Sequence, residues 1–217
     1  MGNRSYKILL DGRWSLEDMM NFSRVYFQNY SFLYCLESHI SNVSTEAVLK
    51  DCELRGGFSY VNIYSIFRSY IQKIQKQDIP QIQSIQYASP GWLELALNPD
   101  VADQFAKVLG IYLGAPVAAT AIYNRLHKIF SDLKKRREED KLASLKLCLE
   151  ETKVAQKLCD ELSKGLGFQS IESLNKYTKD VEESSKLMLA HYRRITKIAK
   201  FIQNGKASFP IKDEIDE

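Results

Sequence analysis

The sequence predicts an α+β protein that is mostly helical, and three observations lead to this class. Apolar residues recur at steps of three and four over most of the chain, as they do in helices that bury one face. Two stretches, 5–10 and 82–97, have the length and pattern of strands. Beyond residue 167, apolar residues return at every seventh position. We therefore expect a small β-hairpin or three-stranded element with N-terminal helices, followed by a long C-terminal antiparallel helical hairpin.

Composition limits the function classes. The chain has 217 residues, of which 45% are hydrophobic and 26% are charged, as in ordinary globular proteins. A net charge of +3 is too small for strong non-specific attraction to nucleic acid or anionic lipid, so nucleic acid is not expected as a partner. The four cysteines form no CxxC motif and the N-terminus has no signal-peptide core, which predicts reduced thiols and a cytoplasmic protein.

The N-terminal region is expected to alternate strand and helix. A strand over 5–10 turns at Asp11, and Ser15 begins a helix whose apolar stripe runs from Met19 to Ile40. After the break at 55–57, a second helix is predicted from Ser59 to Ile74. With the hairpin over 82–97, these elements form a predicted module of residues 1–130.

The hairpin turn contains Ser89, Pro90 and Gly91. Proline presets one backbone dihedral, and we expect Gly91 to supply a positive φ, so the turn is interpreted as structural. The alternative is a ligand-binding turn, in which backbone N–H groups near Ser89 and Gly91 hold the ligand.

Residues 108–124 contain no charge. Gly110 and Gly114 form a GxxxG pattern, which allows two helix backbones to approach closely in membranes and in water-soluble cores. We expect a buried helix pair, and the alternative is a membrane-acting effector that uses the segment 101–124.

From Pro116 no helix breaker occurs before Gly165, which predicts one helix of about 75 Å. Its middle, 132–141, is charged on all sides and should cross solvent. The glycine turn at 165–167 should make the preceding apolar stripe and the heptad helix antiparallel neighbours, giving a coiled-coil-like hairpin over 131–205 and an acidic tail over 206–217. Apolar residues off the seam would form a second face for another protein or another copy of the chain: Leu147, Leu187, Leu189 and Ile198.

Catalytic and metal-binding motifs are not recognisable. His39, His127 and His191 form no HExxH pattern, and the chain has no phosphate-binding glycine loop and no nucleophile elbow. We therefore expect no cofactor and no metal site. Asp11 and Glu94 flank predicted strands and are a candidate carboxylate pair, although separate structural roles are favoured.

Two stretches suggest anion binding. Arg55, Gly56 and Gly57 precede a predicted helix start, where backbone N–H groups attract negative charge. A basic cluster ends the last helix, where it suits the negative end of the helix dipole; the alternative is a nucleic-acid patch. This cluster comprises Arg193, Arg194, Lys197 and Lys200.

The segments "RGGFSYVNIY" (55–64) and "IQSIQYASPGWLEL" (82–95), with "LLDGRWSLEDM" near the start, resemble a group of uncharacterised bacterial proteins. The resemblance covers residues 7–125. It implies a bacterial or phage source and a compact N-terminal module, in an accessory or phage-defence type of system. It attaches no activity and transfers no catalytic residue.

The leading hypothesis is a non-enzymatic interaction or oligomerisation protein, whose partner is another protein or a second copy of the chain. The first alternative is the membrane-acting effector. The second is a small enzyme with a site near Asp11, Arg55, Ser89 and Glu94.

Overall fold

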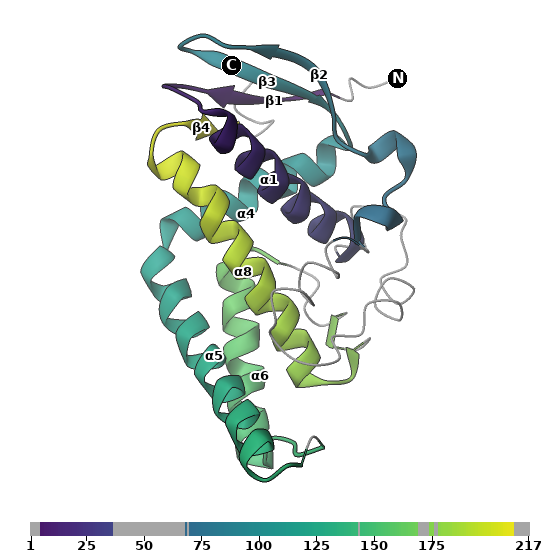
Figure 1. The fold of residues 1–217 in the computed structure, drawn as a ribbon, viewed down its shortest axis with the longest axis vertical. Coiled ribbons are helices and arrows are strands. Elements are labelled where there is room, and N and C mark those ends of the chain that lie inside the picture. The colour runs from purple at the N-terminus through teal and green to yellow at the C-terminus, as the bar shows by residue number, and fades with distance from the viewer. Residues whose placement is uncertain are drawn as a thin grey trace.

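The computed structural model describes residues 5–36, 68, 70–142, 144–168, 174, 175 and 178–210. A four-stranded antiparallel sheet lies at one end, and helices extend from one of its faces (Figure 1). The class predicted from the sequence, mostly helical α+β, is confirmed. The predicted helix from Ser59 and the glycine break at 55–57 lie outside the described residues, apart from positions 68 and 70–74 at the end of that helix.

The sheet is built from β1 (Ser5–Leu10), β2 (Gln81–Gln86), β3 (Gly91–Ala96) and β4 (Ala207–Ser208), in the order β2-β3-β1-β4. Its central pair matches Ser5 with Ala96 and Leu10 with Gly91. Alternation places Ile8, Leu93 and Leu95 on the inner face, where they are buried against the helices. The predicted hairpin over 82–97 is confirmed, and β4 adds a strand that was not predicted.

Helix α1 (Leu16–Leu36) begins as its sequence predicts. The Ser15 hydroxyl accepts from the Asp18 N–H at 3.0 Å, and the Asp18 carboxylate accepts from the Ser15 N–H at 3.0 Å. One face carries a ladder of stacked rings, Phe22, Tyr26, Tyr30 and Tyr34, with centroids 6.1–6.3 Å apart. The Tyr30 hydroxyl donates to the carbonyl of Asp78, which lies in the short 3₁₀ helix η1 (Lys76–Asp78), at 2.7 Å.

The uncharged segment forms two helices that meet at a sharp bend. Helix α4 (Pro99–Gly114) and the start of α5 (Pro116–Glu139) are inclined at 90°. No single helix in the described ranges is long and apolar enough to cross a membrane, and these two pass such a test only as a bent pair, by length and composition.

The predicted close helix contact at Gly110 and Gly114 is wrong. Both glycines are exposed, and a Cβ added to either would meet nothing within 4 Å. Helix α4 buries the opposite face, which carries Phe105 and Leu109.

The predicted 75 Å helix is also wrong. Helix α5 ends at Glu139, and α6 (Leu149–Gly165) returns along it as an antiparallel neighbour. A capping box starts α6: Cys148 N–H donates to Glu151 at 3.0 Å, while the Glu151 N–H donates to the Cys148 sulfur at 3.5 Å. The charged middle of the predicted rod therefore ends at the tip of a hairpin (Figure 1).

Helix α8 (Val181–Gln203) is the central helix of the bundle and contacts α1, α4, α5 and α6. It runs in the same direction as α6, because both are antiparallel to α5: Arg137 meets Glu182, and Tyr123 meets Arg193. The expectation that the glycine turn makes α6 and α8 antiparallel is therefore corrected. The antiparallel hairpin is formed by α5 and α6 instead.

The proposed second face of the heptad helix is part of the core. Leu187, Leu189 and Ile198 are only 2%, 0% and 0% exposed, and Leu147 is half-buried. Every residue of α8 from Ser184 to Tyr192 is buried, because helices cover that segment on more than one side. These leucines and Ile198 hold the bundle together and leave no second apolar face on α8.

The last described residues belong to the fold. Ala207 and Ser208 pair with Leu10 and Leu9, and Phe209 packs against the core. One contiguous set of buried side chains includes residues from both sides of the predicted module boundary at 130/131, which falls inside α5. The predicted acidic tail over 206–217 is corrected at its start, because 206–210 are ordered by the sheet and the core.

Candidate functional site

The turn at Ser89 and Gly91 uses its polar groups internally. The Ser89 hydroxyl and the Gly12 N–H both donate to one carboxylate oxygen of Asp11. These hydrogen bonds lower the pKa of Asp11, and the bond from Ser89 has the larger effect. Gly91 is not among the glycines with positive φ, contrary to expectation. It is required because a Cβ there would collide with the carbonyl oxygens of Gln86 and Ala88, the latter only 2.8 Å away.

The second predicted constellation is not assembled. In the sheet register Glu94 lies opposite Lys7, and Gly91 lies opposite Leu10. Asp11 follows that last pair, so the two carboxylates are separated by about four residues of strand, roughly 13 Å. Glu94 accepts instead from the Ser84 hydroxyl at 2.9 Å. The anion site predicted at Arg55, Gly56 and Gly57 lies outside the described residues.

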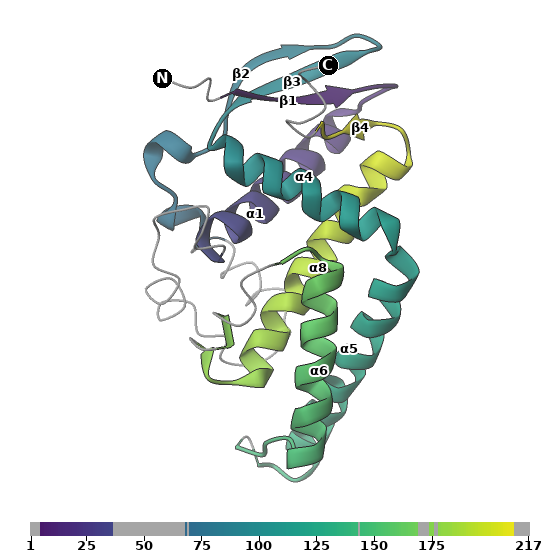
Figure 2. The same cartoon turned by 180° about the vertical axis from the view of Figure 1, so that it is seen from behind.

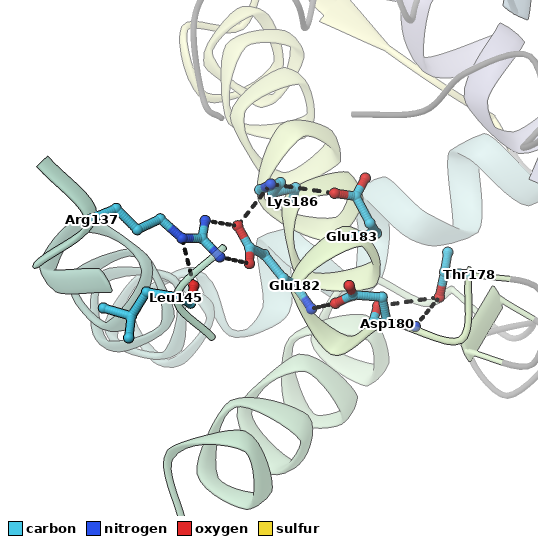
Figure 3. A network of polar contacts seen from close by, with 7 residues as sticks. All are labelled: Arg137, Leu145, Thr178, Asp180, Glu182, Glu183 and Lys186. Atoms are coloured by element: carbon cyan, nitrogen blue, oxygen red, sulfur yellow. Dashed lines mark hydrogen bonds and ion pairs between the residues drawn. The ribbon is translucent and has the colours of Figure 1, made fainter. Parts of the chain in front are cut away.

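A buried ionic network joins the tip of the hairpin to the start of α8 (Figure 3). The two terminal guanidinium nitrogens of Arg137 each donate to the Glu182 carboxylate at 2.9 Å, and the Arg137 Nε donates to the Leu145 carbonyl at 2.7 Å. Lys186, only 7% exposed, bonds Glu182 at 2.9 Å and Glu183 at 3.3 Å. Burial tends to raise the pKa of Glu182, but hydrogen bonds from Arg137 and Lys186 bring it below its ordinary value.

This network is closed, because its cations and carboxylates satisfy one another. Asp180 completes it by accepting from the Glu182 N–H at 2.7 Å as the helix cap. Each of these contacts is explained by groups of the protein itself, without a bound ligand. We therefore assign the network a structural role, which is to fix the hairpin against α8.

The strongest candidate site is a groove between α1 and α8, which we call the basic groove. Its volume is about 720 Å³. Helix α1 supplies one wall, while α8 and the segment after it supply the other; the two helices lie side by side in both views (Figures 1 and 2). The residues that line it are Asp18, Asn21, Arg24, Val25, Gln28, Arg193, Arg194, Thr196, Lys197, Lys200, Phe201, Asn204 and Lys206.

Several contacts hold the walls of the basic groove in place. Lys206 donates to the Asp18 carboxylate at 2.7 Å, which ties the end of α8 to the start of α1. That hydrogen bond is the main reason why the pKa of Asp18 falls to about 2. Arg193 donates from Nε to the Tyr123 hydroxyl at 2.7 Å, and Arg194 donates to the Ala190 carbonyl at 3.0 Å. The guanidinium groups of Arg193 and Arg194 are therefore already held in place by contacts within the protein.

The charge of the basic groove is strongly unbalanced. Six basic side chains line it, and the single carboxylate, Asp18, is already bonded to Lys206. Within the described part of the chain, Arg24, Lys197 and Lys200 make no ion pair. Basic side chains thus outnumber carboxylates in the groove lining by six to one, in contrast to the closed network at the start of α8. Such a surface favours an anionic ligand.

Sequence reasoning found only half of this groove. Arg193, Arg194, Lys197 and Lys200 stand out as a run, and they were assigned to the helix dipole. Arg24 joins them only through the packing of α1 on α8, which no local pattern indicates, and Lys206 is added by the segment after α8. A helical projection of α1 would have placed Arg24 one turn from Asn21 and Gln28, on its polar side.

The groove has the means to bind but not an evident means to catalyse. Its lining has no cysteine or histidine, and its one carboxylate is held by Lys206. Elsewhere among the residues with described positions, no group of three or more His, Cys, Asp or Glu side chains could hold a metal. Comparison with protein-family models, curated proteins and solved structures gave no match.

Proposed function

We propose that this chain is a non-enzymatic interaction protein and that its basic groove binds an acidic segment of a protein partner. The observation that supports the proposal is the excess of positive charge around one cavity: six basic residues face a single, already bonded carboxylate. Arginine can hold a carboxylate through two parallel hydrogen bonds, and lysine adds a flexible positive charge, so both residue types can bind carboxylates. The proposed setting is a bacterial accessory or defence-type system, in the cytoplasm.

An acidic peptide is favoured over a nucleic acid because the aromatic ring in the groove lining, that of Phe201, is already stacked within the fold. Tyr192 is buried and stacks on Tyr123 with centroids 4.2 Å apart. Phe201 stacks on Trp14 at 5.5 Å with nearly parallel planes. Both rings near the groove are thus engaged within the fold, whereas single-stranded nucleic acids bind largely by stacking on exposed aromatic rings.

The test is a binding titration of the full chain with two fluorescent probes of equal length, a decaglutamate peptide and a single-stranded decanucleotide. We expect the peptide to bind and its affinity to fall as salt is added. The groove variant Lys197→Glu/Lys200→Glu changes two exposed residues and should weaken peptide binding at least about tenfold, a loss of roughly 1.4 kcal/mol.

The matched control is Lys128→Glu/Lys135→Glu, which changes net charge equally at two exposed positions of α5. This control should retain affinity within about twofold, since these lysines lie outside the groove lining. Equal losses in both variants would mean that only net charge matters, and the groove would not be the site. Preferential binding of the oligonucleotide would replace the acidic-peptide proposal with a nucleic-acid one.

A further inference from the structure

Strand β2 is an open edge of the sheet. It pairs with β3 on one side, and no other described strand pairs with its outer side. All six of its residues are exposed. Alternate N–H and C=O groups of an edge strand point outward, so the strand can accept another strand through main-chain hydrogen bonds.

A bulge gives β2 an apolar face. The register with β3 shifts between Ile82 and Ser84. As a result Ile82 pairs with Leu95 and Ile85 pairs with Leu93, which places both isoleucines on the inner face, although they are three residues apart. The helices bury Leu93 and Leu95 but leave Ile82 62% and Ile85 51% exposed. The apolar inner face of the sheet therefore continues one strand beyond its helical cover.

Strand β2 has a bulge but lacks two other common protections of an edge strand, charge and proline. Natural edge strands carry charges or proline, which discourage pairing with other chains. From Ile79 to Leu93 the sequence has no charged residue, and its prolines fall outside the strand itself. A charged partner strand, whether acidic or basic, would have no opposite charge to pair with along this edge. An uncharged strand is therefore the better complement to β2.

We propose that β2 pairs with β2 of a second copy of this chain, antiparallel about a two-fold axis between Gln83 and Ser84. In that register Ile82 faces Ile85 and Gln81 faces Gln86 of the other copy. The faces also agree, because Gln81 and Gln86 lie with Ala96 and Trp92 on the outer side. The strand QIQSIQ is thus nearly self-complementary in composition and face, and two four-stranded sheets become one of eight strands.

The proposed contact is small, so we expect a weak dimer. Each copy contributes a six-residue edge, two isoleucines and the neighbouring Tyr87, which is 69% exposed. A standard stable interface buries about 1,600 Å², more than such an edge supplies, so the dimer should dissociate on dilution. This contact is independent of the basic groove, which lies between α1 and α8.

The experiment is sedimentation-velocity ultracentrifugation of the full chain over a concentration series from about 1 to 500 µM, the range in which weak interfaces assemble. We expect the average mass to rise from monomer to dimer for the wild type. Ile85→Lys should stay monomeric, since each introduced lysine would face Ile82 of the other copy and place a charge on the apolar inner face. Val154→Lys, which changes a 45% exposed valine on α6, is the matched control and should still dimerise.

A second measurement does not depend on any substitution. Hydrogen exchange of the amides in 81–86 should slow at the high end of the concentration series and speed up on dilution, because pairing protects the outward N–H groups. A wild type that remains monomeric throughout would overturn the proposal. So would a dimer that Ile85→Lys leaves intact, or exchange in 81–86 that is the same at all concentrations.

Discussion

His191 shows how one buried side chain can control stability. It is fully buried, and its ring stacks on Phe32 with centroids 4.1 Å apart and planes 7° apart. Neither ring nitrogen has a hydrogen-bond partner among the described residues. Burial, with a further contribution from Arg194, lowers the His191 pKa to about 3. The imidazole is therefore neutral in the folded protein and behaves as an aromatic core residue.

We expect the free energy of unfolding to fall as the pH is lowered from 6.5 towards 3. The unfolded chain binds a proton at His191 near pH 6.5, whereas the folded protein does so only near pH 3. The contribution of the neutral His191 to the free energy of unfolding is complete above pH 6.5, and it decreases by about 2 kcal/mol between pH 7 and pH 5. Urea unfolding of the wild type and His191→Leu at both pH values measures this difference.

His191→Leu removes the titrating group and leaves all carboxylates in place, so it should lose less stability over that interval than the wild type does. Equal losses in the two proteins would show that other groups cause the acid sensitivity. The same comparison at pH 7 reports on packing alone, because the wild-type imidazole is neutral there in both states.

The elements differ in how far local sequence determines them. The start of α1 at Ser15 and the hairpin around Gly91 depend on residues within a few positions, and both were predicted. The pairing of α5 with α6 depends on a turn at 140–148, where the sequence has no glycine or proline to mark it. The antiparallel hairpin was therefore expected between the wrong helices. The basic groove was missed for a related reason, because it requires α1 and α8 to meet.

The network at the start of α8 explains why the hairpin lies against that helix, and it leads to a test of its parts. Glu182 neutralises both Arg137 and Lys186, so Glu182→Gln should cost about 3 kcal/mol by leaving Lys186 buried with one longer contact to Glu183. Arg137→Met should cost about 1–2 kcal/mol, since only one ion pair and the Leu145 hydrogen bond are lost. Chemical denaturation gives both values.

The control for this comparison is an exposed ion pair on the same hairpin. Lys134 and Glu138 lie 3.6 Å apart with 68% and 65% of their side chains exposed. Lys134→Ala should change stability by less than about 0.5 kcal/mol. If Glu182→Gln costs no more than Arg137→Met, the shared role of Glu182 is refuted.

Residues from β1 and from the segment after β4 pack together and join the early part of the described chain to its late part. Phe209 stacks against Phe22 and Tyr26 with ring centroids 6.1 Å apart, and it meets Phe105 edge-to-face with centroids 5.5 Å apart. The Tyr6 hydroxyl donates to the Pro210 carbonyl at 2.8 Å. A pattern search along the chain gives little warning of this closure, because two residues of strand and one aromatic ring have no periodicity to detect.

Phe209→Ala should therefore destabilise the whole fold by about 2 kcal/mol, rather than fray one end. Its half-buried ring sets the value below that of a fully buried phenylalanine. Thermal unfolding followed at two probes, helix content by far-ultraviolet circular dichroism and tryptophan fluorescence, should show one common shift. Ser208→Ala changes an exposed neighbour and should leave the midpoint unchanged; a fluorescence shift alone would indicate only local loosening.

The late position of α8 also determines when the protein can fold. The aromatic ladder of α1 is made early in synthesis, yet the helix that packs against it begins at Val181, and the Tyr6–Pro210 bond joins residues 204 positions apart. A ribosome must synthesise α8, up to Gln203, before this core has its central helix. We therefore expect the aromatic ladder of α1 to stay exposed until α8 has been synthesised, a stage at which exposed apolar surface favours aggregation.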